Sequence, residues 1–281
     1  MPIALYEKYH DVDRDDEHFY FYKYVAFNTG ALGILINNEL KYTNPVDFND
    51  PFDCLFSVEI DFKNFNKSNY EEMIGIQGSA KEWFRNREKL KVGIKNRARA
   101  GFVEDFRKRI SVTCFSSSPL NMLMWSHYAC NHTGFLLEFK IPIWSNKGNL
   151  PIPVIYSDEY PVMKLHWDIV NFLKNENNQI DLIKKMVLSK AECWSYEKEY
   201  RLIHDSQLAP NDALILKEYD PKILSSVIIG AKMCESEYQQ IANAVDDFNK
   251  KHTSQVKIYK AELAKKEFRI VVPKHPRLSQ K

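Results

Sequence analysis

The run from Trp194 to Ile203 places three charged side chains at two-residue intervals among aromatic and aliphatic residues. If the run is a β-strand, Glu197, Glu199 and Arg201 share one face. Two like charges on one face repel each other, so a cation, a hydroxyl-rich ligand or water must meet them. The segment therefore predicts either a polar binding site or a solvated outer face on which Arg201 pairs with one glutamate.

The composition is that of an ordinary globular protein, with 44% hydrophobic and 27% charged residues among 281. The formal net charge of +2 gives no global argument for binding to nucleic acid or to an acidic membrane. Five scattered cysteines without C-x-x-C spacing argue against zinc and predict reduced thiols. The scattered cysteines also predict that the chain has no metal site. Since no apolar run is long enough to cross a bilayer, we expect a cytoplasmic protein without a membrane partner.

The predicted elements divide the chain into three parts. Residues 1–18 are an acidic lead-in, residues 19–272 a single α+β domain, and residues 273–281 a C-terminal tail. A helical insert at about 68–109 is basic, with eleven Lys/Arg against four Asp/Glu between Lys81 and Arg109. For this insert, a solvated helix face is favoured over a nucleic-acid patch.

Periodicity and turn residues predict the elements of the domain. Strands are expected at 18–27, 40–43, 109–115, 134–139, 151–156, 197–203, 223–229, 256–263 and 268–272, and helices at 29–38, 68–109, 120–129, 162–192 and 236–250. Because strands and helices do not alternate regularly, the fold class is α+β rather than a doubly wound sheet.

Three further blocks are dense in groups that bind ligands. Tyr22-Lys23-Tyr24 ends an aromatic strand, where alternation places Lys23 opposite both tyrosines. The turn at 44–53 (NPVDFNDPFD) is either a structural turn or a pocket wall, and its aspartates lack the spacing of a calcium loop. Residues 115–134 carry Ser, His, Tyr and Trp, but no G-x-S-x-G elbow surrounds a serine, which argues against a hydrolase triad.

The order of these blocks resembles a large bacterial family catalogued only as a domain of unknown function, number 2971. The resemblance runs from about residue 20 to about residue 265. It rests on Tyr22-Lys23-Tyr24, Phe48-Asn49-Asp50-Pro51-Phe52-Asp53, Cys114-Phe115-Ser116, Met124-Trp125-Ser126-His127-Tyr128, Gly134 and Trp194-Ser195-Tyr196-Glu197-Lys198-Glu199-Tyr200-Arg201.

The chain also resembles, more weakly, the ADP-ribosyltransferases. These enzymes carry an Arg or His on the first strand, an aromatic/Ser motif on a middle strand and a later Glu, often within E-x-E. Here Glu197-Lys198-Glu199 resembles the last motif and Phe115-Ser116-Ser117 the middle one, while Lys23 stands where the family has Arg or His. This resemblance implies a split mixed or antiparallel sheet flanked by helices, with NAD as substrate.

The resemblance also implies roles for individual residues. Glu199 would be the carboxylate that stabilises an oxocarbenium-like state as the nicotinamide–ribose bond breaks, and Glu197 would act on the acceptor as a general base. Lys23 or Arg201 would meet the pyrophosphate. The remaining predicted NAD-binding residues, which include the ring-stacking candidates, are Tyr24, Asn49, Ser116, Trp125, His127 and Tyr128.

Three functions stay open from the sequence. The first is an NAD-consuming enzyme, a toxin or phage-defence effector, that transfers ADP-ribose to a macromolecule or hydrolyses NAD. The second is a non-catalytic ligand-sensing or protein-interaction module of a bacterial defence system, with a regulatory partner protein. The third is a nuclease or nucleic-acid binder that uses the Lys81–Arg109 stretch together with the acidic turn.

Overall fold

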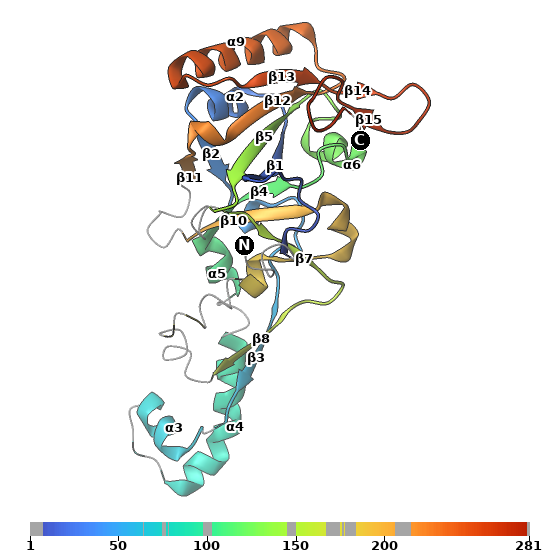
Figure 1. Ribbon diagram of the computed structural model, residues 1–281. Helices are drawn as coiled ribbons and strands as arrows, with labels where there is room; N and C mark the ends of the chain where they lie inside the picture. The colour runs from blue at the N-terminus through green and yellow to red at the C-terminus, as the bar shows by residue number, and fades with distance from the viewer. Residues whose placement is uncertain are drawn as a thin grey trace.

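A mixed sheet of seven strands organises the computed structural model of the chain (Figure 1). The structure describes residues 8–279 apart from 64, 75–76, 78, 98–102, 145–149, 167–174, 176, 178–183 and 206–214. In spatial order the strands are β13 (Lys257–Lys260), β12 (Leu224–Ile229), β5 (Phe135–Pro142), β1 (His18–Val25), β4 (Ile110–Ser116), β10 (Glu199–Asp205) and β6 (Ile152–Pro153). Neighbouring strands are antiparallel except β12 and β13.

Both faces of the sheet are buried, as the alternating aromatic residues of β1 illustrate. Phe19 and Phe21 lie in the larger apolar core, which α2 (Thr29–Ile36) and α9 (Glu235–His252) cover (Figure 1). Tyr20 and Tyr22 lie in a second core together with Trp125 of α6 (Met122–Tyr128). Since strand alternation sends neighbouring rings to opposite faces, one aromatic strand supplies both cores.

The sheet is split between β1 and β4. β1 pairs with β5 along its whole length, from His18 to Val25, but with β4 only through Tyr22 and Ser116. Among the described residues of β1 and β4 the pairing stops there, and the start of β4 instead bridges Thr43 through Val112. Lys23 and Tyr24 therefore diverge from β4, and the space between the strands is open to side chains.

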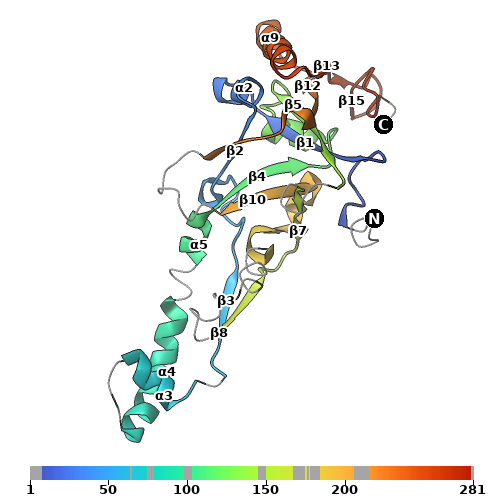
Figure 2. The same ribbon diagram turned by 60° about the vertical axis from the view of Figure 1, so that its left-hand side comes forward.

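An arm extends away from the sheet, as Figure 2 shows. Its elements are β3 (Ser57–Asp61), α3 (Lys67–Ile74), α4 (Ala80–Arg97), α5 (Val103–Arg109) and β8 (Val162–His166), which pairs in parallel with β3. The smaller elements are η1 (Pro45–Asp47), β2 (Glu39–Tyr42) with β11 (Ile215–Glu218), β7 (Ile155–Tyr156) with β9 (Ser189–Lys190), η3 (Glu192–Glu197), η4 (Pro221–Ile223) and β14 (Glu262–Leu263) with β15 (Ile270–Val271).

The expected combination of a mixed sheet with helices is confirmed, but the short strands β3, β9 and β11 were not expected, and two predicted elements begin differently. The predicted helix at 162–192 begins as strand β8, because its alternating residues pair with β3, and positions 167–174 lie outside the described residues. The strand predicted from residue 197 begins at Glu199, because the preceding residues form the 3₁₀ helix η3. Lys198 ends that helix in the left-handed region, at φ 44°.

The described ends of the chain pack onto the sheet. In the predicted lead-in, Tyr9 is buried in the larger core and donates a hydrogen bond to the Pro151 carbonyl. In the predicted tail, His275 and Leu278 are fully buried. Among the described helices, none combines the length and the apolar character needed to cross a bilayer.

Two glycines allow close approach of backbones where α6, β5 and β12 meet. A Cβ at Gly134 would overlap the Val25 carbonyl oxygen, and one at Gly230 would overlap the His132 carbonyl oxygen. We expect Gly134→Ala and Gly230→Ala each to lower the free energy of unfolding by about 2–3 kcal/mol, as overpacking does. Chemical denaturation measures the change.

Gly93 supplies the matched control, since it lies within α4 and an added Cβ meets no atom within 4 Å. Gly93→Ala should raise stability by about 0.5–1 kcal/mol, because alanine favours the helix. A Gly230→Ala variant as stable as the wild type would contradict the close packing at this junction.

Candidate functional site

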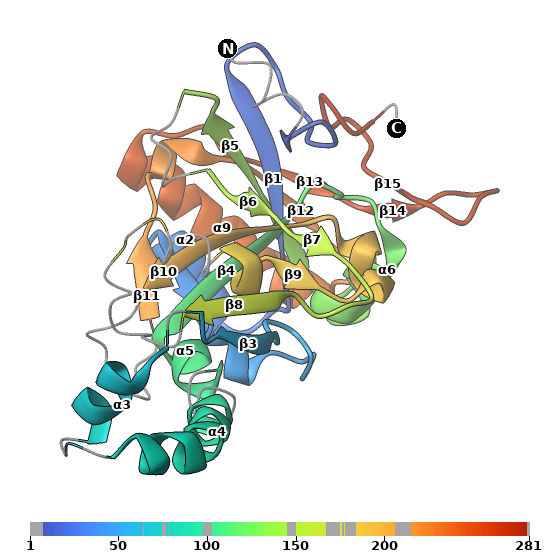
Figure 3. The same ribbon diagram turned by 90° about the horizontal axis from the view of Figure 1, so that it is seen from below.

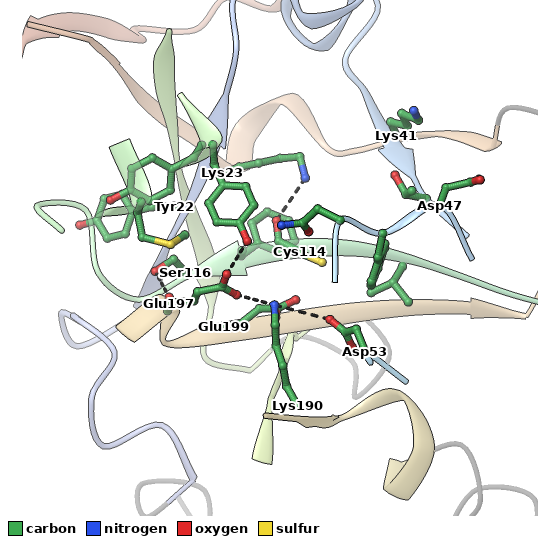
Figure 4. A pocket seen from close by; sticks show the side chains of 18 residues that line it. Tyr22, Lys23, Lys41, Asp47, Asp53, Cys114, Ser116, Lys190, Glu197 and Glu199 are labelled. Carbon is green, nitrogen blue, oxygen red and sulfur yellow. Dashed lines mark hydrogen bonds and ion pairs between the residues drawn. The ribbon is translucent and has the colours of Figure 1, made fainter. Parts of the chain in front are cut away.

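A pocket of about 250 Å³ opens where β1 and β4 separate (Figure 4). It is lined by 18 residues from four parts of the chain. The lining comprises Tyr22, Lys23 and Tyr24 from β1; Lys41, Thr43, Asp47, Phe48, Asn49 and Asp53 from β2 and the following turn; Val112, Cys114, Phe115, Ser116, Met124 and Tyr128 from β4 and α6; and Lys190, Glu197 and Glu199.

Beside β10 lies a cluster of five buried charges, Asp53, Lys190, Glu197, Glu199 and Arg201, called here the charge cluster, of which all but Arg201 line the pocket. The Lys190 ammonium lies 2.6 Å from Glu197 Oε2, 3.0 Å from Glu199 Oε2 and 3.5 Å from Asp53 Oδ2. Figure 4 shows Lys190 between these carboxylates. One ammonium therefore neutralises parts of three acidic groups.

Arg201 holds the other side of the charge cluster. Its Nε lies 2.7 Å from Glu199 Oε1, and its Nη2 donates to Glu199 Oε2 at 2.9 Å. Its Nη1 and Nη2 also reach the two carboxylate oxygens of Asp53, at 2.9 and 2.7 Å. Arg201 is fully buried and does not line the pocket. The geometry therefore makes it a charge partner, and the solvated-face interpretation of this segment is wrong.

Glu197 and Glu199 converge by a route other than strand alternation. Glu197 is the last residue of η3, Lys198 turns the chain in the left-handed region, and Glu199 opens β10. Ser116 fixes the turn, since its Oγ donates to the Glu197 carbonyl at 2.5 Å. The two carboxylates thus meet at Lys190 although only one of them lies on the strand.

The pKa values of the two glutamates move in opposite directions. Burial would raise the pKa of Glu199, but Arg201 and then Lys190 hold it far below its ordinary value. Burial raises the pKa of Glu197 by more than Lys190 lowers it. For Lys190, burial disfavours the ammonium, yet Glu199 and the other carboxylates raise its pKa well above the usual value. Of the two glutamates, Glu197 is therefore the one that takes up a proton more readily.

The two glutamates also differ in what they can offer a ligand. Glu199 Oε2 accepts from both Lys190 and Arg201, and Oε1 accepts from Arg201. Glu197 accepts one hydrogen bond on each oxygen, from the Tyr128 hydroxyl on Oε1 and from Lys190 on Oε2. Since a carboxylate oxygen can accept two hydrogen bonds, Glu197 keeps the greater capacity to accept one from a ligand.

Lys23 enters the pocket from β1, beside the gap in the sheet (Figure 4). Its Nζ donates to Thr113 Oγ1 at 2.9 Å and to the Cys114 carbonyl at 3.1 Å. Both acceptors are uncharged, and within the described part of the chain no ion pair joins Lys23 to a carboxylate. Burial lowers the pKa of its amine. Lys23 thus bonds across the gap between β1 and β4 to two uncharged acceptors on β4.

Most of the residues predicted as NAD-binding line this pocket, namely Lys23, Tyr24, Asn49, Ser116 and Tyr128. Three others do not. Trp125 is fully buried under Tyr24 and donates from Nε1 to the Pro119 carbonyl. His127 is exposed, with Nδ1 3.0 Å from the Tyr196 hydroxyl. Arg201 lies beneath the pocket, as described above. None of these three side chains lines the pocket, so they are not placed to stack on a ligand ring or to contact a phosphate there.

Two residues of the charge cluster, Lys190 and Asp53, were not among the site residues predicted from the sequence, and neither were Lys41 and Asp47 of the pocket lining. Lys190 lies between Ser189 and Ala191, and no local sequence motif identifies it as a site residue. Asp53 belongs to the acidic turn, but its ion pair with Arg201 spans 148 positions and has no sequence signal. The sequence also does not show the register of the sheet, in which Ser116 pairs with Tyr22 on one side and with Glu199 on the other.

Comparison with known proteins reaches one family. A family model described as "Protein of unknown function (DUF2971)" matches residues 124–202, which supports the resemblance over that range. The matched segment contains five of the 18 pocket-lining residues, namely Met124, Tyr128, Lys190, Glu197 and Glu199. No curated protein and no solved structure matches the chain.

The contacts of Glu199 predict that it supports the fold. Glu199→Gln leaves Arg201 and Lys190 with less buried negative charge, and we expect a loss of about 3 kcal/mol in the free energy of unfolding at neutral pH. The folded pKa of Glu199 is depressed. Its contribution is therefore present above about pH 4.3, the ordinary pKa of glutamate, and is lost as the pH falls. Urea denaturation at pH 7 and pH 3 measures both effects.

Glu192→Gln is the control for this comparison, since Glu192 begins η3 but is exposed. It should change stability by less than about 0.5 kcal/mol. Equal stability of the Glu199→Gln variant and the wild type at pH 7 would contradict the assigned ion pairs.

Proposed function

We propose that the chain is an NAD-consuming enzyme that breaks the nicotinamide–ribose bond and passes ADP-ribose to water or to a macromolecular acceptor. One observation carries the proposal. The three blocks named by the ADP-ribosyltransferase resemblance, represented by Lys23, Ser116 and the Glu197–Glu199 pair, line a single pocket at a split in the sheet. Blocks so far apart in the sequence meet there because β1, β4 and β10 are neighbours.

The charge of the pocket wall suits the reaction. When all its members are ionised, the charge cluster holds three carboxylates against two cations, so one negative charge is uncompensated. An oxocarbenium-like state develops positive charge on the ribose, and buried, fixed negative charge stabilises such a state more strongly than water does. The wall therefore supplies electrostatic stabilisation without rearrangement.

The geometry distributes the roles among the glutamates. Glu199 contributes fixed charge, because Arg201 and Lys190 keep it ionised and occupied. We assign the contact with substrate or acceptor to Glu197, because burial raises its pKa above the ordinary glutamate value, the direction that favours a proton-transferring group. Tyr128 orients Glu197 by donating its hydroxyl hydrogen to Oε1.

The cationic part of the pocket suits the rest of the substrate. Lys23 has only uncharged hydrogen-bond partners, and Lys41 lines the same region. An anionic phosphate would compensate these charges. The volume of about 250 Å³ is below the usual size of a drug-sized site, which fits the nicotinamide–ribose half rather than the whole dinucleotide.

The saturation of Glu199 also favours a second function, a non-catalytic ligand-sensing module. In that case the pocket binds a nucleotide or nicotinamide, raises the melting temperature by mass action and releases no product. Nicotinamide release therefore separates the two functions, and binding alone does not.

Glu197→Gln tests the enzymatic proposal. Purified protein incubated with NAD should release nicotinamide, measured by chromatography, and Glu197→Gln should slow release by about 10²–10⁴-fold because the proton-transferring group is removed. Its melting temperature should stay close to that of the wild type, since Glu197 makes fewer ionic contacts than Glu199.

Glu192→Gln, an exposed change on the same 3₁₀ helix, should leave the rate unchanged. Absence of nicotinamide release by the wild type would refute the enzyme, and binding of NAD in that case would establish the sensing module. Full activity of Glu197→Gln would refute the assignment of Glu197.

A further inference from the structure

The hairpin formed by β14 and β15 carries the most exposed large apolar side chain recorded for the described residues. Phe268 is 98% exposed at the turn between the strands. Figure 3 shows this hairpin projecting from the body beyond α6, and Figure 1 shows the same projection from the side. A phenylalanine left in water forgoes about 2 kcal/mol of burial. Its position calls for a partner that covers the ring.

The base of the hairpin is anchored in the core, which holds the turn that carries Phe268 out from the body. Ala261, Ile270 and Val272 are buried in the core that contains Trp125. Leu263 pairs with Ile270, and the Ala264 amide donates to the Arg269 carbonyl at 3.0 Å. The ring is thus presented at the end of a fixed two-stranded support.

The segment of the chain that carries Phe268 is basic. The described residues from β13 to position 279 expose six Lys/Arg side chains and two glutamates. The cations are Lys257, Lys260, Lys265, Lys266, Arg269 and Lys274, and the acids are Glu262 and Glu267. This local excess of four positive charges exceeds the net charge of +2 carried by the whole chain. The partner that complements this surface is therefore a polyanion.

We propose that the hairpin and its flanks, residues 257–274, form a docking surface for single-stranded nucleic acid, with Phe268 stacked on an unpaired base and the lysines on phosphates. Single strands offer two features that complement this surface: a regular row of negative phosphates for the lysines, and unpaired bases on which Phe268 can stack. The surface differs from the Lys81–Arg109 stretch, which belongs to the arm.

A membrane surface fits the hairpin less well. Insertion into a bilayer interface needs an apolar face made by several side chains. Here the turn interleaves Phe268 with Glu267 and Arg269, which form an ion pair at 2.8 Å, and Leu263 is the other exposed large apolar residue of the hairpin. Burying Phe268 in lipid would draw that ion pair out of water, whereas stacking on a base leaves it solvated.

Fluorescence anisotropy with a labelled 20-nucleotide oligo(dT) tests the proposal on the full chain. The wild type should bind with an affinity that falls as salt rises. Phe268→Ala should weaken binding about tenfold through the loss of one stacked base. Lys265→Gln with Lys266→Gln should reduce the slope of log affinity against log salt by about 1–2. All these side chains are exposed, so melting temperatures should not change.

The double change Lys81→Gln with Lys89→Gln removes the same charge from exposed positions of α4 and should leave binding unchanged. Three results would overturn the proposal: no binding of the wild type to the oligonucleotide, loss of binding only in the α4 variant, or Phe268-dependent binding to vesicles of anionic lipid without binding to oligo(dT). The proposal stands independently of NAD cleavage, because its readout contains no NAD.

Discussion

Two buried cations, Lys190 and Arg201, share three buried carboxylates, and the pocket wall depends on how they divide them. Arg201 takes Asp53 and most of Glu199, while Lys190 spans Glu197 and Glu199. Removing Glu199 from this set would break its ion pairs with both cations, and breaking a buried ion pair costs far more than losing a surface one. The charge cluster therefore ties the 44–53 turn, β9 and β10 together, and the same contacts decide which carboxylate remains available to a ligand.

The split in the sheet creates the pocket that these charges line. A continuous β1–β4 ladder would place backbone where the pocket now lies. The Lys23 ammonium instead bonds the Cys114 carbonyl across the gap, and Tyr24 closes the opening by bonding the Ser118 carbonyl at 2.6 Å. The strand break, the lysine and the carboxylates are thus parts of one arrangement, with cationic and anionic walls fixed by neighbouring strands.

The sequence predicted the elements whose signals are local. The alternating rings of β1 and the apolar spacing of α9 are sufficient to place those elements. Glu197 and Glu199 both line the pocket, but not for the reason that their spacing suggested, since Glu197 lies on η3 and only Glu199 lies on the strand. The sequence did not predict features that depend on residues far away along the chain. Residues 162–166 form a strand only because β3 lies beside them. Lys190 belongs to the site because the fold brings three carboxylates to it, which no local sequence pattern shows. Trp125 was predicted to contact the ligand from its place in the 115–134 block, but its side chain is buried in the core.

Arg201 and Lys190 keep Glu199 ionised, and of the two glutamates Glu197 is left as the one that takes up a proton more readily. Carboxyl ¹³C NMR titration of glutamate-labelled protein, with the Glu197 resonance identified by its absence in Glu197→Gln, tests this most directly. The account predicts a pKa for Glu197 above the ordinary glutamate value of about 4.3, together with a second buried glutamate that stays ionised to the acid limit of the fold. A Glu197 pKa at or below 4.3 would contradict it.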